Sequence, residues 1–157
     1  MQPNPAFMQQ AIDLATDNVT SGRGGPFGAV IVRDAQVLAT GVNLVTAIND
    51  PTAHAEVTAI RNACRALGGF QLTGCQIYTS CEPCPMCLAA IYWARLDAIF
   101  YGNSAADAAD AGFDDSFLYQ EVARPHDARR IPITPLLREE AHSSFAAWQR
   151  SPLKIDY

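Results

Sequence analysis

Two short segments of the chain carry residue types that bind transition metals. The first reads Thr52-Ala-His-Ala-Glu56 and the second reads Cys81-Glu-Pro-Cys-Pro-Met-Cys87. Cys84 and Cys87 stand three residues apart after a proline, so at the start of a helix both sulfurs would lie on one face, one turn apart. Two thiolates and the imidazole of His54 suit three corners of a zinc tetrahedron. The fourth corner is left for water, which is the pattern of catalytic zinc sites.

The spacing of His54 and Glu56 indicates where the metal must lie. Residues two apart on a regular helix, with about 3.6 residues per turn, point roughly 200° apart and cannot reach one target beside the helix. They can share a target beyond its N-terminal end, because the Cα–Cβ bonds tilt that way. The turn Asp50-Pro51 puts both residues in the opening turns. We therefore expect the metal off that end, where the helix beginning at Cys84 also points its N-terminus.

Glu56 is predicted to carry the proton chemistry of this site and not to bind the metal. Zinc lowers the pKa of its bound water from about 15.7 toward about 7, which provides a nucleophile at neutral pH. A carboxylate beside that water can take its proton, pass it to a ring nitrogen and help to protonate a leaving amine. The arrangement suits the hydrolytic removal of an amino group from an amidine-like ring carbon.

The remaining cysteines leave one alternative open. Three of the five cysteines fall within seven residues, which argues for metal-binding thiolates and against a disulfide framework. Cys81 and Cys84 also have a ligand spacing, and a closed site of three cysteines and one histidine would be structural. We favour a site without Cys81, because this residue precedes Pro83 and should lie outside the helix. Cys64 and Cys75 are predicted to be small core residues.

Around these segments the sequence predicts alternating helices and strands. Apolar runs predict strands at 28–32, 37–42, 76–79 and 98–101, and periodicity predicts helices from Pro5 and Asp50 and at 84–95, 114–122 and 139–150. Residues 131–134 are predicted to form an edge strand, because Pro132 cannot donate to a ladder. The alternation favours a three-layer α/β/α sandwich with a mixed central sheet and helices on both faces. No linker divides the chain, so 1–157 is predicted to be one domain with 151–157 as a C-terminal tail.

Charge and hydropathy argue against two classes of partner. The formal net charge is -5, and Lys154 is the only lysine beside ten scattered arginines. Proteins that bind nucleic acids usually cluster Lys and Arg against the phosphates, so such a partner is disfavoured, although a local basic patch could exist within an acidic total. No apolar run is long enough to span a bilayer, and the N-terminus lacks the features of a secretory signal. We expect a soluble, cytoplasmic protein without a membrane partner.

The His-x-Glu segment followed by Pro-Cys-x-x-Cys is the signature of zinc nucleobase deaminases, and the chain resembles the cytidine deaminase superfamily. Its segments 24–30, 49–56, 81–87 and 111–115 look like those of bacterial guanine deaminases in that superfamily, and the resemblance extends from about Phe7 to Tyr157. It implies a cytidine deaminase-like fold, one Zn²⁺ per subunit and a purine base as substrate. Guanine would be hydrolysed at C2 by zinc-activated water to xanthine and ammonia, in purine catabolism or salvage.

The resemblance also implies a purine pocket, formed by Phe27, Asn43, Ala55, Trp93, Asp115 and Tyr157. Phe27 and Trp93 would sandwich the ring, and Asn43 offers both a donor and an acceptor to one base edge. The backbone of Ala55 would lie between the ligand and the base. An Asp115 carboxylate would accept from the ring N–H or the amino group of guanine, unless it is instead the N-cap of the helix that begins at Ser116, a role that Asp114 could also take.

Superfamily members of this kind are dimers whose C-terminal segment crosses to the neighbour. The resemblance therefore implies a homodimer with exchange of this segment. Tyr157 would then serve the site of its own subunit or that of the partner.

Several other functions share parts of this pattern. A tRNA adenosine deaminase has nearly the same Pro-Thr-Ala-His-Ala-Glu and Cys-x-x-Cys segments, but it must hold a polyanion, which a single lysine fits poorly. A guanosine or aminotriazine deaminase shares the motif as well. From a different class, the chain could be a zinc-stabilised binding module without catalysis. A Cys-x-x-Cys redox protein fits less well, because it has no need of His54 and Glu56.

Overall fold

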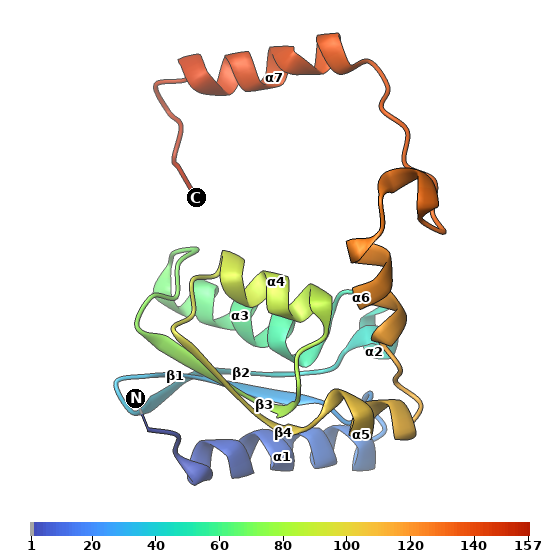
Figure 1. Cartoon of the computed structure of the whole chain (residues 1–157). Coiled ribbons are helices and arrows are strands. Elements are labelled where there is room, and N and C mark those ends of the chain that lie inside the picture. The colour runs from blue at the N-terminus through green and yellow to red at the C-terminus, as the bar shows by residue number, and fades with distance from the viewer. Residues whose placement is uncertain (1) are drawn as a thin grey trace. The chain divides into compact units, whose positions relative to one another are not determined.

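A mixed four-stranded sheet organises the first part of the molecule. The computed structural model describes residues 2–157, and the chain divides into two units, Met1–Leu118 and Tyr119–Tyr157. The first unit contains β1 (Gly28–Arg33), β2 (Gln36–Val42), β3 (Cys75–Cys81) and β4 (Ala98–Asn103), in the order β2-β1-β3-β4 (Figure 1). β1 runs antiparallel to β2 and to β3, whereas β3 and β4 are parallel. The predicted mixed sheet is confirmed.

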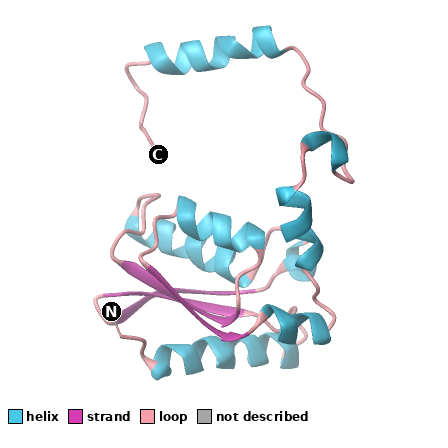
Figure 2. Ribbon diagram, in the orientation of Figure 1, coloured by secondary structure: helices cyan, strands magenta, loops and turns pink. Residues whose placement is uncertain are grey.

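Helices cover both faces of this sheet. Helix α1 (Pro5–Thr20) packs on one face, and α3 (Ala55–Leu67) and α4 (Pro85–Trp93) lie over the other, as Figures 1 and 2 show. The short helices α2 (Val45–Ile48) and α5 (Ala105–Asp110) lie in the connections. α1 begins as expected, because the Asn4 side chain accepts from the amide of Ala6. The three-layer α/β/α architecture is therefore confirmed.

The two central strands carry the core on both faces. Val30 pairs with Tyr78 and Ile31 pairs with Ile77, and all four side chains are almost fully buried. Val30 and Tyr78 pack with Ala11 of α1, whereas the other pair packs in the layer beneath α3 and α4. A strand that is covered on both faces is apolar at successive positions. This is why β1 reads in the sequence as a continuous apolar run.

The strand directions bring three loops to the same edge of the sheet. Gly28, at the start of β1, pairs with Val42 at the end of β2, and Ala29 pairs with Thr79 near the end of β3. The amide of Gly28 also donates to the Ser80 hydroxyl over 3.0 Å. The loop before β1, the loop after β2 and the turn after β3 therefore meet, and they carry or lead into several of the predicted residues: Phe27, Asn43, His54 and Cys84.

The second unit is mainly helical. Helix α6 (Ser116–Ala123) leads into it, followed by a 3-10 turn η1 (His126–Ala128) and by α7 (Arg138–Arg150). The edge strand predicted at 131–134 is not formed in this chain, because a strand needs a ladder partner and neither unit supplies one to these residues. None of the helices among the described residues 2–157 is long and apolar enough to cross a membrane.

The packing of β2 against α3 leaves no room for a side chain at Gly41. A Cβ there would lie 2.3 Å from the Ala55 carbonyl oxygen and 2.3 Å from the Ala59 nitrogen. Both atoms belong to the backbone of α3, so neither can turn aside as a flexible side chain would. This contact fixes the depth at which the first turn of α3 lies on the sheet.

Gly41→Ala is therefore expected to lower the free energy of unfolding by about 1–3 kcal/mol, the usual cost of overpacking, and by more if α3 cannot shift. Gly69→Ala is the matched control, because a Cβ at Gly69 would have nothing within 4 Å, and we expect it to stay within about 0.5 kcal/mol of the parent. Urea unfolding of the two variants measures the difference. Equal stabilities would show that the contact at Gly41 is not tight.

Candidate functional site

Three side chains from two helix starts converge at the edge of the sheet where the loops meet. His54 is the N-cap residue of α3 and Cys84 is the N-cap residue of α4, and neither side chain caps its own helix. His54 Nδ1 lies 3.6 Å from Cys84 Sγ and 3.5 Å from Cys87 Sγ. The ligand atoms of the three residues all lie within 4.8 Å of one another. The metal ligands predicted from the sequence are therefore assembled in space.

The spacing of these atoms fits zinc. With Zn–S bonds of about 2.3 Å and Zn–N bonds of about 2.0–2.1 Å, a tetrahedral site requires nitrogen and sulfur to stand about 3.5–3.6 Å apart. The two distances from His54 Nδ1 match this value. Two sulfurs and one imidazole nitrogen form a zinc ligand set that leaves one coordination position for a small molecule, as catalytic sites require.

The surroundings of Cys84 favour the thiolate form that binds a metal. A hydrogen bond from Cys87 and a further one from His54 lower the pKa of the Cys84 thiol to about 4, although burial acts in the opposite direction. Cys84 and His54 also lie at the N-terminal ends of α4 and α3. These ends carry partial positive charge and unpaired N–H groups. Negative charge is therefore favoured where the two helices meet.

Glu56 lies beside the metal ligands and is not one of them. It is the second residue of α3, and only 7% of it is exposed. Burial raises the pKa of its carboxyl group, and the negative charge of Cys84 acts in the same direction. A carboxyl group whose pKa is raised above its usual value is better able to take up a proton as well as release it. Glu56 thus has the position and the electrostatics of a proton carrier.

Cys81 is held away from the metal ligands, as expected. Its thiol donates to the carbonyl oxygen of Ser104 over 3.7 Å, and burial raises its pKa to about 11. It is absent from the group of residues that could hold a metal ion. Three protein ligands remain, so a closed structural site does not fit this geometry. Cys75 is part of the core beneath α3, and Cys64 packs against that core, as predicted.

Four of the six predicted pocket residues lie on segments at this edge. Phe27 precedes β1, Asn43 follows β2, and Ala55 is the buried first residue of α3. Asp115 follows α5 and has a raised pKa, mainly through burial and then through the negative charge of Cys84. The structure thus brings these four side chains and the metal ligands to one place. Whether they bind the substrate stays a prediction at this point.

The Gly112–Asp115 segment shows details that the sequence alone did not reveal. The side chain of Asp114 accepts from the amide of Ser116, the first residue of α6, over 2.9 Å, so its carboxylate is engaged at the start of this helix. The ring of Phe113 meets the ring of Phe27 edge-on, with centroids 4.9 Å apart. Phe113 was not predicted as a site residue. Its place directly before Asp114 and Asp115, within the segment 111–115 that resembles guanine deaminases, was the signal that could have identified it.

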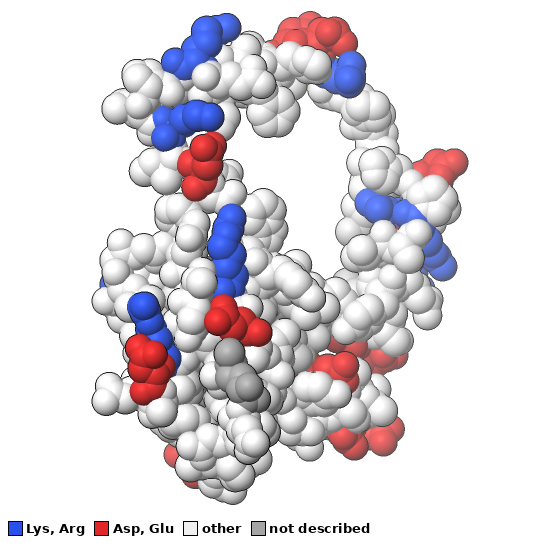
Figure 3. Space-filling model, turned by 60° about the vertical axis from the view of Figure 1, so that its left-hand side comes forward, with Lys and Arg blue, Asp and Glu red and all other residues white. Residues whose placement is uncertain are grey.

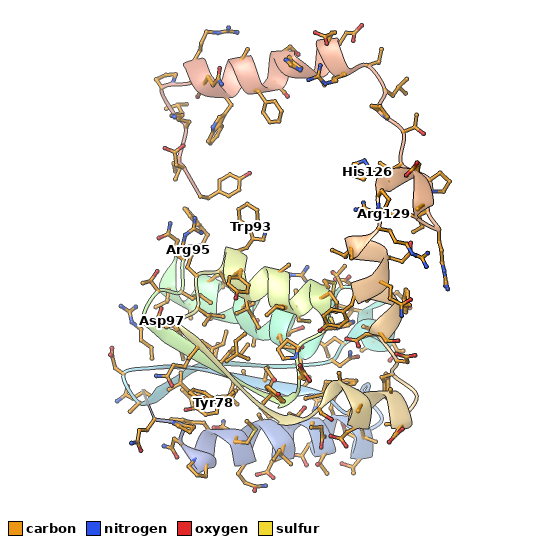
Figure 4. All side chains as sticks on the ribbon, in the orientation of Figure 1. Tyr78, Trp93, Arg95, Asp97, His126 and Arg129 are labelled. Carbon is orange, nitrogen blue, oxygen red and sulfur yellow. The ribbon has the colours of Figure 1, made fainter. Side chains whose placement is uncertain are left out.

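Trp93 and Tyr157 lie elsewhere in the chain. Trp93 ends α4 six residues after Cys87, about 9 Å farther along the helix axis, and it is 64% exposed. Figure 4 shows it beside Arg95, where the chain turns toward Asp97. The amide of Asp97 donates to the carbonyl oxygen of Cys75 at the start of β3, so this end of α4 lies at the edge of the sheet opposite the metal ligands.

The first unit therefore does not place Trp93 across a ring from Phe27. Tyr157 belongs to the second unit, where it is 70% exposed and its ring packs edge-on against that of Trp148. The pocket roles of Trp93 and Tyr157 stay predictions.

The geometry predicts opposite outcomes for two cysteine variants. Cys87→Ser should weaken zinc binding by more than about 100-fold, because removing a ligand exceeds the roughly 10–100-fold cost of changing residues that only support one. Cys81→Ser is the matched control and should retain one zinc per chain. Metal analysis after dialysis against a weak chelator measures both. If Cys81→Ser lost zinc to the same extent, Cys81 would have to belong to the ligand set.

Comparison with known proteins agrees with this site. Residues 1–103 match the family described as the cytidine and deoxycytidylate deaminase zinc-binding region. The chain is 56% identical over 151 residues to a guanine deaminase of Bacillus subtilis (strain 168). This alignment covers 96% of this chain and 97% of the relative. It is 31% identical over 150 residues to a tRNA-specific adenosine deaminase of the same organism, covering 96% of this chain and 91% of the relative.

Solved structures show the same likeness over the whole chain. The crystal structure of guanine deaminase from Bacillus subtilis superposes with a TM-score of 0.96 at 54% identity and covers 99% of both chains. A guanine deaminase structure from Nitrosomonas europaea gives a TM-score of 0.68 at 28% identity, covering 91% of this chain and 82% of the other. The chain therefore belongs to the cytidine and deoxycytidylate deaminase family of zinc-binding proteins.

Proposed function

We propose that this protein is a zinc-dependent guanine deaminase that hydrolyses guanine to xanthine and ammonia. The observation that carries the proposal is the three-ligand site of His54, Cys84 and Cys87 with the buried carboxyl group of Glu56 beside it. The choice of guanine is supported by 56% identity to a guanine deaminase along nearly the full length of both chains. A role in purine salvage or catabolism and a cytoplasmic location form part of the same proposal.

The chain's own residues supply the proton movements. Bound zinc supplies a Lewis acid that lowers the pKa of water near neutrality. Glu56 takes the proton of the attacking water and delivers it to the ring nitrogen beside C2. It then assists protonation of the leaving amine. One C–O bond forms at C2 and the exocyclic C–N bond breaks, so guanine and water give xanthine and ammonia. Burial raises the pKa of Glu56, which favours the protonated form that carries the proton between these steps.

The residues around the metal account for the selection of guanine. The Asp115 carboxylate would accept from the ring N–H and the 2-amino group, and a purine without these donors would leave that carboxylate unpaired. Asn43 Oδ1 already accepts from the amide of Val45 over 3.3 Å, so Asn43 would present its Nδ2 group to an acceptor on the base. Phe27, braced by Phe113, would offer one face to the planar ring.

A tRNA substrate fits the charge of the protein less well. A polyanion requires clustered cations, whereas the chain has a net charge of -5 and one lysine. On the face drawn in Figure 3, the Lys and Arg side chains form no extended basic patch and lie among acidic and uncharged residues. The relative that acts on tRNA is also the more distant of the two, at 31% identity. A free base is therefore the better substrate.

We further propose that residues 1–157 form one catalytic domain, which is completed by exchange of the C-terminal segment in a homodimer. The second unit is shorter than the roughly 40 residues that usually suffice for independent folding without disulfides or metals. α7 buries none of its residues. The unit exposes many large apolar side chains: Ile131, Leu136, Leu137, Phe145, Leu153 and Ile155. These side chains would need an apolar surface on another chain to cover them.

The first unit offers such surfaces. β4 is an edge strand of the sheet, and beside it lies a groove of about 590 Å³ lined by α1 and β4 residues such as Met8, Ile12 and Ile99. α4 exposes Tyr92 and Trp93 in addition. In the proposed dimer the partner's 131–134 segment would extend the sheet at β4, and its tail 151–157 would bring Tyr157 to the pocket. The pocket role proposed for Trp93 would likewise be fulfilled in this dimer.

Glu56→Gln tests the catalytic assignment. We expect turnover of guanine to fall by about 10²–10⁴-fold, the usual contribution of a positioned acid–base group, while one zinc per chain is retained. Ammonia release from guanine, adenine, cytosine, cytidine and guanosine is measured for the zinc-loaded wild type and for the variant. A wild type that releases no ammonia from guanine would refute the proposed substrate. A wild type that is inert on every base would indicate a zinc-stabilised binding module.

A mixing experiment tests the exchange of the tail. Glu56→Gln has an intact tail and an inactive centre, whereas a chain without residues 151–157 has an intact centre and no Tyr157. Each homodimer should be inactive. Refolding the two together should restore about a quarter of the wild-type sites, because half of randomly paired dimers are mixed and each has one complete site. No recovery on mixing would mean that Tyr157 acts within its own subunit or not at all.

A further inference from the structure

One buried amide in α1 connects two of the segments that form the proposed pocket. Asn18 is fully buried. Its Nδ2 group donates to the carbonyl oxygen of Gly25 over 2.9 Å and to that of Asn43 over 2.8 Å. Both partners are acceptors only, so the nitrogen must face them and the orientation of the amide is determined. Asn18 lies 25 positions before Asn43 in the sequence, and no motif drew attention to it.

These bonds close a ring that passes through Phe27 and Asn43. The amide of Phe27 donates to the same Gly25 oxygen over 2.8 Å, and the amide of Asn43 donates to the Phe27 oxygen over 3.1 Å. The ring therefore runs from Asn18 to Gly25, Phe27 and Asn43 and back to Asn18. Removing the Asn18 side chain would break its bonds to the Gly25 and Asn43 oxygens. Of the bonds in the ring, only the one from the Asn43 amide to the Phe27 oxygen would then connect the Phe27 loop to Asn43.

Further backbone contacts hold the loop beside this ring. The main-chain oxygen of Asn18 accepts from the amides of Arg23 and Gly24 over 3.0 and 3.2 Å. A Cβ on Gly24 would lie 2.3 Å from the Asn43 oxygen and 2.9 Å from Asn18 Nδ2. Asn18 thus holds the loop through both its main-chain oxygen and its side chain. Gly24 lies against Asn18 Nδ2 and the Asn43 oxygen, where there is no room for a side chain.

The Asn18 side chain uses only its Nδ2 group in the ring. Its Oδ1 atom is buried without a hydrogen-bond partner among the described residues, and a buried acceptor left unpaired costs free energy. Such exceptions require an explanation, because buried polar atoms are nearly always satisfied. The bonds of the Asn18 Nδ2 group fix the positions of Phe27 and Asn43 at the proposed site.

We propose that Asn18 is a positioning residue for binding of the purine base, acting through Phe27 and Asn43. This rests on the proposed function, in which those two residues contact guanine. The buried amide holds the ring of Phe27 and the side chain of Asn43 in register before substrate arrives. A displacement of about 1 Å in such groups can cost about 100-fold in rate. The effect of Asn18 should therefore appear mainly in kcat/KM for guanine.

Asn18→Ala tests the proposal against Leu72→Ala. Leu72 is also fully buried, but its amide bonds to Ala94 near the start of β3, far from the pocket. At a temperature where both variants are folded, Asn18→Ala should lower kcat/KM for guanine by about 100-fold, mostly through KM, and should retain one zinc per chain. Leu72→Ala should keep kcat/KM within a few-fold of the wild type. If the two variants lost activity equally, or if Asn18→Ala lost its zinc, the proposal would be overturned.

Amide hydrogen exchange tests the ring without relying on turnover. In Asn18→Ala the amides of Phe27 and Asn43 should exchange faster, while that of Ile77 in the centre of the sheet stays protected. Unchanged exchange at Phe27 and Asn43 would refute the ring as a constraint. If wild type failed to act on guanine while the exchange result held, the proposed function would be wrong and the ring would stand.

Gly24→Ala serves as a second variant should Asn18→Ala not fold. It disturbs the ring from the side of the loop without changing the Asn18 residue itself. It should also raise KM and speed exchange at Phe27, with Gly69→Ala as the neutral control. A Gly24→Ala protein with wild-type KM and wild-type exchange would likewise overturn the proposal.

Discussion

The whole site depends on two helices that begin at the same point in space. His54 and Cys84 are each the last residue before a helix, so their side chains project beyond the N-terminal ends and not from the helix sides. Starting either helix one residue earlier or later would turn the ligand by about 100° around the axis and would break the match to a zinc tetrahedron. The same arrangement points two positive helix ends at the metal, which favours thiolate and other negative charge there.

The sheet determines where those helices begin. β3 ends at Cys81 and leads to α4, while β2 ends at Val42 and leads through a connection that contains α2 to α3. The contact at Gly41 fixes α3 against β2 through backbone atoms, so the position of α3 cannot be adjusted by changes of rotamer. The antiparallel pairing of β1 with both neighbours then brings the Phe27 loop to the same edge. The metal site and the pocket are consequences of one topology.

The features that could be predicted from the sequence are those whose chemistry is written in local spacing. His54, Glu56, Cys84 and Cys87 have side chains whose types name the metal and the proton carrier, and the turn before each helix indicates where they point. Asn18 could not be found in this way, because it acts on carbonyl oxygens, which every residue carries and no pattern marks. The prediction of an edge strand at 131–134 was wrong for a related reason. The sequence shows that this segment is apolar, but it does not show whether another strand pairs with it.

The division between metal centre and pocket also explains how one family serves different substrates. The match to the zinc-binding region ends at Asn103, and Asp115 and the whole second unit lie beyond it. Both relatives cover 96% of this chain, but the guanine deaminase is 56% identical over that length and the tRNA-specific adenosine deaminase is 31% identical. In the proposed reaction at an amidine carbon, the ligands and Glu56 supply the chemistry. The choice of base would then depend on groups around them, both in the loops that Asn18 holds and in the C-terminal part of the chain.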